Sequence, residues 1–420
     1  MNEIQHTPEL RFDGFTEPWG QQKLSSLVSM HARIGWQNLR ASEFLESGEF
    51  LLITGTDFVD GTVNYNCCHY VDKSRYDQDP NIQVKNGNIL LTKDGTLGKV
   101  AFVQGLSKPA TLNAGVFNIV VKDLAVIDSR YLFHYLRGSF LMDYVDKNAT
   151  GGTIKHLNQN ILVDFPVLLP PIHEQRMLGI TLSKIDSLIT LQQRKYERLQ
   201  HLKQALLRKM FPKPGEQVPE LRFEGFTEPW KERRLGDVGH ATSGVGFPDA
   251  EQGGSSGVPF FKVSDMNLRG NENEMTTANN YVSDSQISRL GWKPVADVPA
   301  MFFAKVGAAV ALNRKRLVRM PFLMDNNTMA YSLRHEYWNV EYAKALFETL
   351  DLPSLAQTGA LPSYNSSDVE DMVVLMPFNF DEQQTIGTFF SRLDALIALY
   401  QGRHERLQHL KQALLRKMFV

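Results

Sequence analysis

The chain of 420 residues contains little cysteine, no long apolar run and almost no net charge. Its two cysteines, Cys67 and Cys68, are adjacent, and adjacent cysteines rarely bridge each other or supply a zinc site of the usual spacing. No stretch approaches the roughly eighteen apolar residues of a membrane span. The N-terminal sequence MNEIQHTPEL lacks the basic and apolar regions of a signal peptide. We therefore expect a protein of the reducing cytoplasm.

Catalytic and cofactor motifs are missing as well. The 11 histidines show neither HExxH nor another paired spacing, which argues against a metal site. There is no nucleophile elbow, no dinucleotide fingerprint and no NPPY-type methyltransferase motif. Residues 92–99 read TKDGTLGK, but a Walker A motif needs Ser or Thr after the lysine, where this chain has Val100. We expect no catalytic site, metal or cofactor in the chain itself.

The overall composition leaves only local surface for binding nucleic acid. A formal net charge of −1 gives no general attraction to DNA, so any DNA contact must come from local basic patches. Contents of 43% hydrophobic and 22% charged residues are typical of a soluble globular protein. The length suggests two to three domains.

The main feature of the sequence is an internal duplication. Residues 197–211 read ERLQHLKQALLRKMF, and residues 405–419 repeat them without a change. Residues 8–19 read PELRFDGFTEPW, and residues 219–230 differ from them only by Glu224 in place of Asp13. Each half of the chain thus opens with one repeated segment and closes with the other.

The closing segments predict two long helices, because they contain strong helix formers and no Gly or Pro. Extended upstream to Glu174 and Glu382, each helix has about 38 residues and a length of about 57 Å. Apolar positions at spacings of 4 and 3 predict a pairing seam. It comprises Leu178, Leu182, Ile185, Ile189, Tyr196, Leu199 and Leu206, with Ile386, Phe390, Leu393, Ile397, Tyr400, Leu407 and Leu414. Each helix alone could cap a local core, but a seam held over about five heptads favours an antiparallel pair.

The opening segments and the linker between the halves are predicted to be extended. Pro, Gly and aromatic residues in the lead-ins indicate a pinned, non-helical chain. Residues 212–219 read PKPGEQVP, which predicts a helix stop and a linker. Because PELRF would follow the second KMF if the chain were circular, we expect the two ends to lie near each other. The halves then form a pseudo-two-fold ring.

Between lead-in and helix, the order of predicted elements repeats while most residues differ. Strands are predicted at 50–54, 88–92, 99–103 and 117–121, and at 258–263, 300–304, 308–312 and 328–333. Helices are predicted at 129–145 and 339–350. A Thr-Gly step (150–151 and 358–359), an Asn (Asn158 and Asn365) and a strand ending in Pro (165–171 and 372–377) follow. This pattern suits two sites that recognise different things.

Polar and basic loops at strand ends are the candidate DNA contacts. The turn with Lys93, Gly95 and Lys99 places ammonium and N–H groups where DNA phosphates can bind, although an ordinary hairpin explains it equally. The candidates of the second half are Lys305, Asn313, Arg314, Lys315, Arg316, Asn326 and Asn327, because Arg and Asn read guanine and adenine edges. Thr54, Lys262 and Ser264 lie in polar loops after strands, where turn formation alone is an alternative. A solvated face is the alternative for the three consecutive cations.

Taken together, these features resemble the specificity (S) subunit of Type I restriction-modification enzymes, the HsdS family. The resemblance covers the whole chain. It rests on both lead-ins, the Thr-Gly and Asn steps, PPIHEQ and PFNFDEQ before the long helices, and RLQHLKQALLRKMF at the end of each half.

The resemblance implies an α/β (α+β) fold with two globular target-recognition domains separated by two long antiparallel helices that form a coiled coil. The first recognition domain with its lead-in would span 1–150 and a central conserved region 151–211. The linker and second lead-in would span 212–230, the second recognition domain 231–356 and a C-terminal conserved region 357–420. Base contacts vary among members of this family, so none is carried over to this chain.

The resemblance also implies a non-catalytic role. Each recognition domain would read one half of an asymmetric bipartite target in double-stranded DNA, and the helices would set the spacer and dock two methyltransferase (M) subunits. Restriction (R) subunits would complete the complex, without membrane association. S-adenosylmethionine, ATP and Mg would be used by the partners. A stand-alone duplicated DNA-binding regulator is the main alternative, and a catalytic chain with an unfamiliar site is the other.

Overall fold

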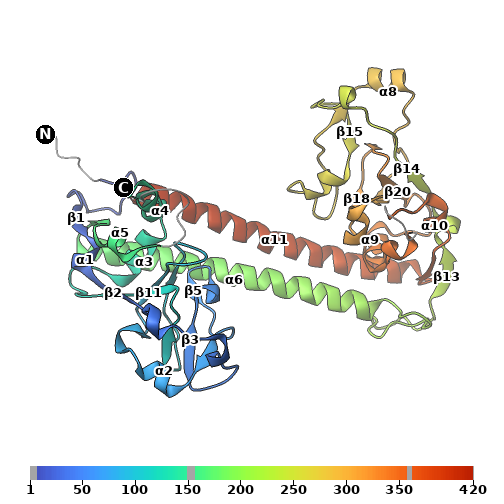
Figure 1. Cartoon of the computed structure of the whole chain (residues 1–420). Coiled ribbons are helices and arrows are strands. Elements are labelled where there is room, and N and C mark those ends of the chain that lie inside the picture. Colours follow the sequence, from blue (N-terminus) through green and yellow to red (C-terminus); the bar gives the residue numbers. More distant parts are fainter. Residues whose placement is uncertain (1–6, 149–156, 357–361, 420) are drawn as a thin grey trace. The chain divides into compact units, whose positions relative to one another are not determined.

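The computed structural model describes residues 7–148, 157–356 and 362–419. Contacts divide the chain into two units. Unit 1 comprises Met1–Gln192 and Arg403–Val420, and unit 2 comprises Gln193–Gly402. Each unit thus contains one recognition domain and the end of the long helix that belongs to the other half of the sequence (Figure 1). The Thr-Gly steps at 150–151 and 358–359 lie outside the described residues.

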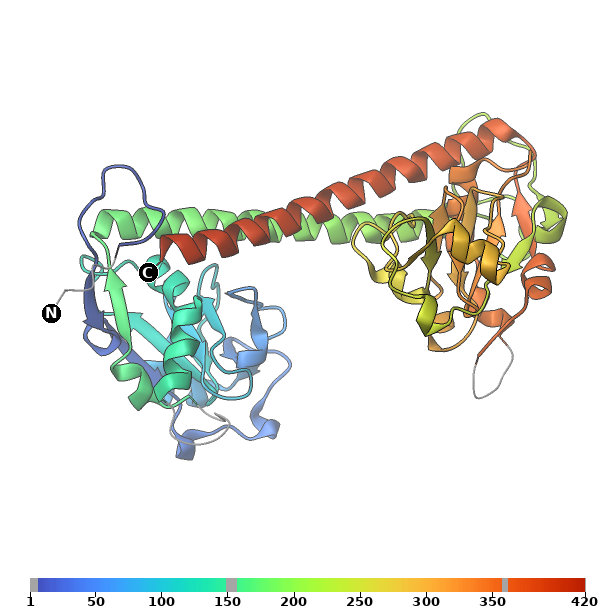
Figure 2. The same cartoon turned by 90° about the horizontal axis from the view of Figure 1, so that it is seen from above.

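The two long helices are α6 (Ile172–Met210) and α11 (Phe380–Met418), each of 39 residues. In unit 1, Asp186 of α6 pairs with Lys411 of α11, and in unit 2 Lys203 of α6 lies 2.6 Å from Asp394 of α11. A second contact in each unit, the Ile189 carbonyl with His404 in unit 1 and Lys195 with the Tyr400 ring in unit 2, shows that partner numbers fall along α11 as they rise along α6. The helices are therefore antiparallel within each unit (Figure 2). The predicted antiparallel pairing is confirmed.

The predicted seam residues divide into two groups by burial. Leu178, Leu182, Ile386, Phe390, Leu393 and Ile397 are buried in the domain cores, and Ile185 is buried as well. Ile189, Tyr196, Leu199, Leu206, Tyr400, Leu407 and Leu414 are half-buried. The starts of α6 and α11 therefore cap a local core as well as facing a second helix, so the two interpretations of the apolar stripe are compatible.

The lead-ins attach to the long helices in the same way in both units. The N–H of Leu10 donates to the Lys417 carbonyl over 2.8 Å, and the N–H of Leu221 donates to the Lys209 carbonyl over 2.8 Å. Arg11 forms a two-pronged ion pair with Glu174, and Arg222 forms one with Glu382. The contact of Leu10 with Lys417 confirms that the first and last described segments of the chain lie together.

In unit 1, a six-stranded sheet has the order β2-β11-β8-β9-β5-β4 and a four-stranded sheet the order β6-β3-β10-β7, while β1 pairs with β12. The strands are β1 (Gly20–Lys23), β2 (Val28–Ala32), β3 (Phe50–Ile53), β4 (Phe58–Val59), β5 (Thr62–Val63), β6 (His69–Val71), β7 (Gln83–Val84), β8 (Ile89–Thr92), β9 (Val100–Phe102), β10 (Ala110–Leu112), β11 (Val116–Val121) and β12 (Pro166–Leu169). The short helices are α1 (Leu24–Leu27), α2 (Lys73–Asp77), α3 (Ser129–Leu136), α4 (Ser139–Asn148) and α5 (Gln159–Val163).

In unit 2, the sheet orders are β14-β20-β17-β18 and β16-β15-β19, and β13 pairs with β21. The strands are β13 (Lys231–Arg234), β14 (Ala241–Ser243), β15 (Val258–Phe261), β16 (Tyr281–Val282), β17 (Ala300–Ala304), β18 (Lys315–Val318), β19 (Leu323–Met324), β20 (Thr328–Ser332) and β21 (Val373–Met376). The helices are α7 (Leu235–Val238), α8 (Asp284–Leu290), α9 (Val340–Thr349) and α10 (Ser366–Glu370).

The two recognition domains share one strand order. The series β2-β11-β8-β9 corresponds to β14-β20-β17-β18, and the parallel pairs β3-β10 and β15-β19 correspond too. The central strands β8 and β17 send alternate side chains into two different cores, as a strand buried on both faces must. Because topology and alternation both repeat, the duplication includes the recognition domains.

Two predicted elements differ in the structure. The helix predicted at 129–145 is broken between α3 and α4, where a Cβ on Gly138 would lie 2.8 Å from the Phe140 ring. The strand predicted at 308–312 is a 3-10 helix, Ala308–Leu312. Gly307 (φ +84°) and Asn313 (φ +49°) flank it, and left-handed residues at both ends prevent an extended strand from running through.

Candidate nucleic-acid interface

Three loops of unit 1 meet at one edge of its sheets. They are residues 54–57 after β3, 93–99 between β8 and β9, and 113–115 between β10 and β11; together they are the unit 1 loop cluster. The N–H of Asn113 donates to the Ile53 carbonyl over 2.9 Å, and that of Lys93 to the Gly115 carbonyl over 2.9 Å. Backbone hydrogen bonds therefore hold the three loops side by side.

Unit 2 has the corresponding arrangement. Its loop cluster consists of residues 262–265 after β15, 305–307 after β17 and 325–327 between β19 and β20. The N–H of Asp325 donates to the Phe261 carbonyl over 3.0 Å, and that of Lys305 to the Asn327 carbonyl over 2.9 Å. These bonds repeat those of unit 1 at equivalent positions, so the framework that presents the loops is duplicated while its side chains are not.

A buried carboxylate fixes the first loop of each cluster. Asp57 accepts a hydrogen bond from the N–H of Thr54 over 2.7 Å, and Asp265 accepts one from the N–H of Lys262 over 2.8 Å. Both carboxylates are buried, and the residue before each, Thr56 or Ser264, is exposed. The turn chemistry suggested by the sequence is present, and it also presents a hydroxyl to solvent at each site.

The predicted lysines at the loop clusters are oriented by local partners. Lys93 Nζ lies 5.6 Å from the centre of the Phe117 ring. Lys262 Nζ donates to Gln252 Oε1 over 2.6 Å, and Lys305 Nζ donates to Ser243 Oγ over 3.0 Å. These three lysines and Thr54 are half-buried, whereas Gly95, Lys99, Ser264, Asn326 and Asn327 are exposed. The structure brings these candidates into the two loop clusters, one set in each unit.

The basic run 314–316 is not the free surface that the sequence suggested. Lys315 is 6% exposed and its Nζ donates to the Leu350 carbonyl over 2.5 Å; burial lowers its pKa to about 8. Burial also lowers the pKa of Arg316, which donates to the Asn271 carbonyl over 2.8 Å. The alternative of a solvated face is therefore wrong for Lys315, whose side chain is buried, and Arg316 is half-buried; the role of either residue as a DNA contact stays a prediction.

The residues on either side of Lys315 also have internal partners. The Asn313 amide donates to the Leu350 carbonyl over 2.9 Å, so Asn313 and Lys315 both bind the chain just after α9. Arg314 is half-buried and donates to Asn267 Oδ1 over 2.6 Å. To contact DNA, Arg314 would have to exchange Asn267 for a base or a phosphate.

Sequence reasoning missed the third loop of unit 1, Asn113, Ala114 and Gly115. Its equivalent in unit 2 was found through the pair Asn326 and Asn327. The signal was the position: a short polar step between two apolar runs, TLNAGVF in one half and LMDNNTM in the other. Asn113 is half-buried at the edge of the cluster, next to the Lys93 turn.

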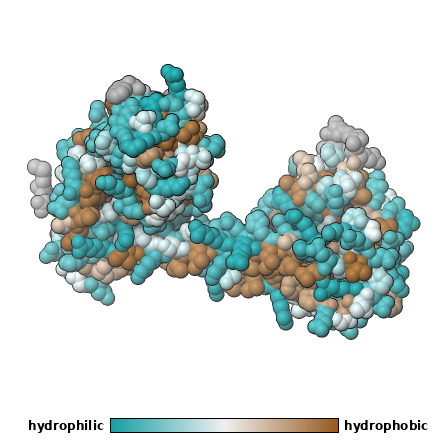
Figure 3. All heavy atoms as spheres, turned by 90° about the horizontal axis from the view of Figure 1, so that it is seen from below, coloured by the Kyte–Doolittle hydropathy of each residue, from teal (hydrophilic) through white to brown (hydrophobic). Residues whose placement is uncertain are grey.

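The long helices offer a second candidate surface. Unit 1 exposes Leu188, Leu191 and Leu410, and unit 2 exposes the equivalent Leu396, Leu399 and Leu202. We call each set a leucine stripe. Exposed cations flank the stripes, among them Lys184 and Arg198 on α6 and Arg392 and Arg406 on α11. Figure 3 shows apolar side chains among polar ones on the surface of the long helices. Such a surface suits an amphipathic helix of a partner.

Within the ranges described above, no three His, Cys, Asp or Glu side chains lie close enough to hold a metal ion. Likewise, none of the described helices is long and apolar enough to cross a membrane.

Comparison with known families gives one match that repeats within the chain. The model of the Type I restriction modification DNA specificity domain matches residues 18–201 and again residues 227–409. Each match covers one recognition domain and most of the long helix that follows it.

Similar proteins and structures point the same way. The chain is 24% identical over 345 residues to the Type I restriction enzyme MjaIX specificity subunit of Methanocaldococcus jannaschii, covering 79% of this chain and 76% of that one. It is 31% identical over 102 residues, 24% of this chain and 20% of the other, to the EcoBI specificity subunit of Escherichia coli. The crystal structure of a Type I S subunit from M. genitalium superposes with a TM-score of 0.67 at 16% identity, covering 99% of both chains.

Proposed function

The chain belongs to the family of the Type I restriction modification DNA specificity domain, and from this premise we propose that it is the specificity subunit of a Type I restriction-modification complex. The subunits of this family recognise DNA and are not themselves catalytic. The chain then reads one bipartite DNA target and directs the methyltransferase and restriction subunits to it.

One observation carries the proposal: two loop clusters rest on the same backbone framework and present different side chains. Unit 1 presents Ala114 and Gly115 where unit 2 presents Asn326 and Asn327, and Thr56 where unit 2 presents Ser264. Equal frameworks support equal modes of approach to a duplex, and different side chains read different base edges. The target is therefore bipartite and its two half-sites differ.

The paired helices supply the other two parts of the function. Both α6 and α11 contribute residues to each unit, so their length sets the spacer between the half-sites. The two leucine stripes are equivalent, and equivalent surfaces bind two copies of one partner, here the M subunit. A structure titled for complex assembly of the type I R-M system matches this chain in fold, with a TM-score of 0.52 at 16% identity over 96% of this chain and 98% of the other.

We assign the cofactors of the complex to its partners. S-adenosylmethionine serves the M subunits, and ATP and Mg serve the R subunits. The near-neutral charge of this chain suits a subunit that shares phosphate binding with its partners.

Mapping methylated adenines in the host genome, with and without an intact copy of this chain, tests the proposal. We expect one asymmetric bipartite motif with a spacer of fixed length to lose its methylation when the chain is removed. A stand-alone regulator would instead bind one site tightly without partners at physiological salt, as a gel shift would show, and would leave the methylation map unchanged.

A further inference from the structure

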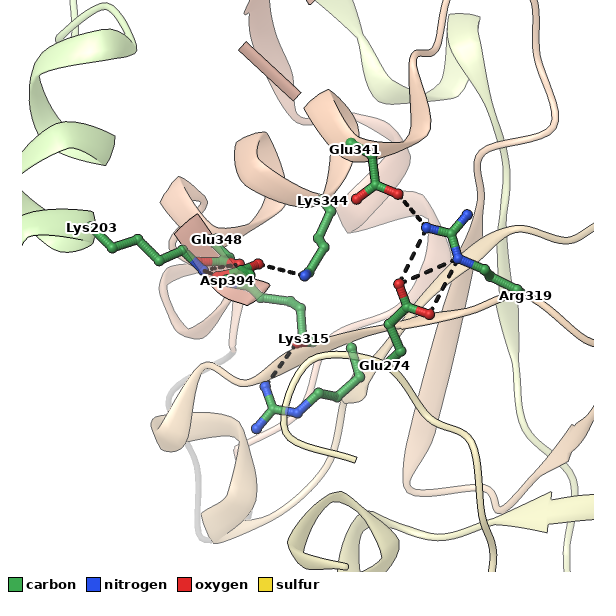
Figure 4. A network of polar contacts seen from close by, with 9 residues as sticks. Lys203, Glu274, Lys315, Arg319, Glu341, Lys344, Glu348 and Asp394 are labelled. Atoms are coloured by element: carbon green, nitrogen blue, oxygen red, sulfur yellow. Dashed lines mark hydrogen bonds and ion pairs between the residues drawn. The ribbon is translucent and has the colours of Figure 1, made fainter. Parts of the chain in front are cut away.

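A cluster of charged side chains lies in unit 2 where the recognition domain meets the long helices. It consists of Lys203 on α6, Asp394 on α11, and Lys344 and Glu348 on α9; Figure 4 shows the four side chains converging. Lys203 Nζ lies 2.6 Å from Asp394 Oδ1 and 2.6 Å from Glu348 Oε2. Lys344 Nζ lies 2.6 Å from Asp394 Oδ2. We call this the unit 2 charge cluster.

Unit 1 has a charge cluster at the same place with a different composition. Lys411 on α11 pairs with Asp186 on α6, and Arg137, just after α3, donates from Nη1 to Asp186 Oδ2 over 2.8 Å. The Phe133 ring lies 5.2 Å from the Arg137 guanidinium carbon. His134 Nδ1 is 4.0 Å from Asp186 Oδ2, in a fully buried ring.

The duplication shows which members are common and which belong to each domain. Lys203 and Lys411 hold the same position in the repeated segment, and Asp394 and Asp186 correspond in the same register, so both units contain the same Lys–Asp pair on the helices. On the domain side, α3 and α9 align through Tyr131 and Tyr342.

That alignment is supported by equal surroundings. Tyr131 stacks on Phe419 at 5.7 Å, and Tyr342 stacks on Phe211 at 5.8 Å. In this alignment, Phe133 of unit 1 is equivalent to Lys344 of unit 2, and Arg137 is equivalent to Glu348. The same helix position therefore bears opposite charges in the two units, and the residue four positions earlier differs with it.

Charge balance explains why the two positions change together. The side chains of Lys203, Asp394 and Lys344 are 12%, 10% and 9% exposed, so an unpaired charge among them is costly. In unit 2, two cations face two carboxylates. In unit 1, Lys411 and Arg137 share the Asp186 carboxylate, Asp60 also acts electrostatically on Lys411, and a phenyl ring takes the position of the second domain-side cation. A lysine together with an arginine at these positions would add a third cation to the two that already share the carboxylate.

We propose that residues 133 and 137 in unit 1, and residues 344 and 348 in unit 2, are positioning residues that hold each recognition domain in one orientation on the helix pair. Either combination, Phe with Arg or Lys with Glu, fits the common Lys–Asp pair, whereas Lys with Arg does not. A recognition domain moved between subunits keeps its spacer only if this pair is matched. The proposal rests on the proposed function for its consequence in DNA reading, but not for its effect on folding.

The test uses charge exchange in the full chain. Glu348→Arg creates the mismatched combination in unit 2, and Lys344→Phe/Glu348→Arg restores the combination of unit 1. The first measurement is the thermal unfolding midpoint of the chain. The second is the ratio of methylation on the cognate target to methylation on a target with a spacer one base pair longer, with purified M subunits present.

We expect E348R to lower the midpoint by several degrees and the spacer ratio about tenfold, and K344F/E348R to return both close to the wild-type values. Asp371→Arg is the matched control, because it reverses one charge of an exposed ion pair with Arg234 in the same unit. An exposed pair contributes little to stability, so this variant should change neither the unfolding midpoint nor the spacer ratio. Equal midpoints for wild type and E348R, or a double variant as impaired as E348R, would overturn the proposal.

If E348R does not fold, the equivalent substitutions in unit 1 test the proposal independently. Phe133→Lys creates the mismatch there, and Phe133→Lys/Arg137→Glu creates the combination of unit 2, with the same expected loss and recovery. If the wild-type complex methylates no bipartite target, the proposed function has failed, and the unfolding midpoints still decide whether the matched pairs hold the domains.

Discussion

Unit 1 and unit 2 have the same framework of helices and strands, but they differ in the side chains of their loops and in the residues that dock each domain. The lead-in anchors, the Lys–Asp pair on the helices and the backbone bonds that hold the loop clusters are the same in both. The side chains of the loops and the residues that dock each domain on the helices differ. Duplicated contacts therefore mark the scaffold, and divergent contacts mark the loop clusters and the docking of each domain on the helices.

The largest effect is expected where the scaffold is most buried. Trp19 packs on Tyr131 and Phe419, and Trp230 packs on Tyr342 and Phe211. Trp19→Ala and Trp230→Ala should each lower the free energy of unfolding by about 3–5 kcal/mol, measured by urea denaturation. If only one of the two variants lost stability, the two tryptophan anchors would not be equivalent.

Phe substitutions at the same two sites sharpen the comparison. The Trp230 indole N–H donates to Glu382 Oε1 over 3.2 Å, whereas that of Trp19 is buried without a partner. Trp230→Phe should therefore cost about 1.5–3 kcal/mol more than Trp19→Phe, because only the first loses a hydrogen bond to a charged group. Equal costs would contradict the difference between the two anchors.

The leucine stripes come next. Leu396→Asp/Leu399→Asp should leave the chain folded and reduce M binding at one stripe at least tenfold, which is about 1.4 kcal/mol. Mass measurement of the purified complex should then show one M subunit in place of two, and Leu188→Asp/Leu191→Asp should do the same at the other stripe. Leu124→Asp, at an exposed leucine outside the two stripes, is the control and should keep both subunits bound.

Two glycines allow a finer comparison. A Cβ on Gly179 would lie 2.9 Å from the Tyr131 nitrogen, and one on Gly387 would lie 2.6 Å from the Tyr342 nitrogen. Each glycine lets the start of α3 or α9 approach a long helix. Gly→Ala at either site should lower the free energy of unfolding by about 1–3 kcal/mol, more at Gly387, as denaturation of the two variants would show. A stabilising effect at either position would contradict the close approach.

The last effect depends on pH and is confined to unit 2. The folded-state pKa of Lys315, about 8, lies below its ordinary value of 10.5, so the unfolded chain binds more protons between these values. Stability attributable to Lys315 should therefore rise with pH through this range, by up to about 1.4 kcal/mol per pH unit. Denaturation at pH 7 to 10 should show a steeper rise for wild type than for Lys315→Met. Parallel curves would mean that the ammonium is not desolvated.

The scaffold could be predicted because the duplicated segments are nearly identical in sequence. Identical segments at 197–211 and 405–419 predicted the paired helices, and the PELRF segments predicted the meeting of the ends that Leu10 and Lys417 make. Continuous apolar runs predicted most strands, because strands such as β8 and β17 are buried on both faces. Both loop clusters follow from these strands, although Asn113 was missed.

The errors arose where backbone direction decides the outcome. Left-handed conformations at Gly307 and Asn313 turn an apolar run into a 3-10 helix, and the sequence does not state a φ angle. Lys315 was predicted as a candidate DNA contact, with a solvated face as the alternative, but its side chain is buried and donates to the Leu350 carbonyl. The charge clusters could not be predicted from the sequence, because Lys203 and Glu348 are 145 residues apart in the chain and meet only in the folded structure.

The most direct test of the account is an exchange of one recognition domain. Residues 231–356 would be replaced by the corresponding domain of another specificity subunit, with positions 344 and 348 kept as a matched pair, and methylated adenines would be mapped across the host genome. The account predicts that one half-site changes while the other half-site and the spacer length stay as they were. Changes in both half-sites, or in neither, would contradict two separate reading domains on a common scaffold.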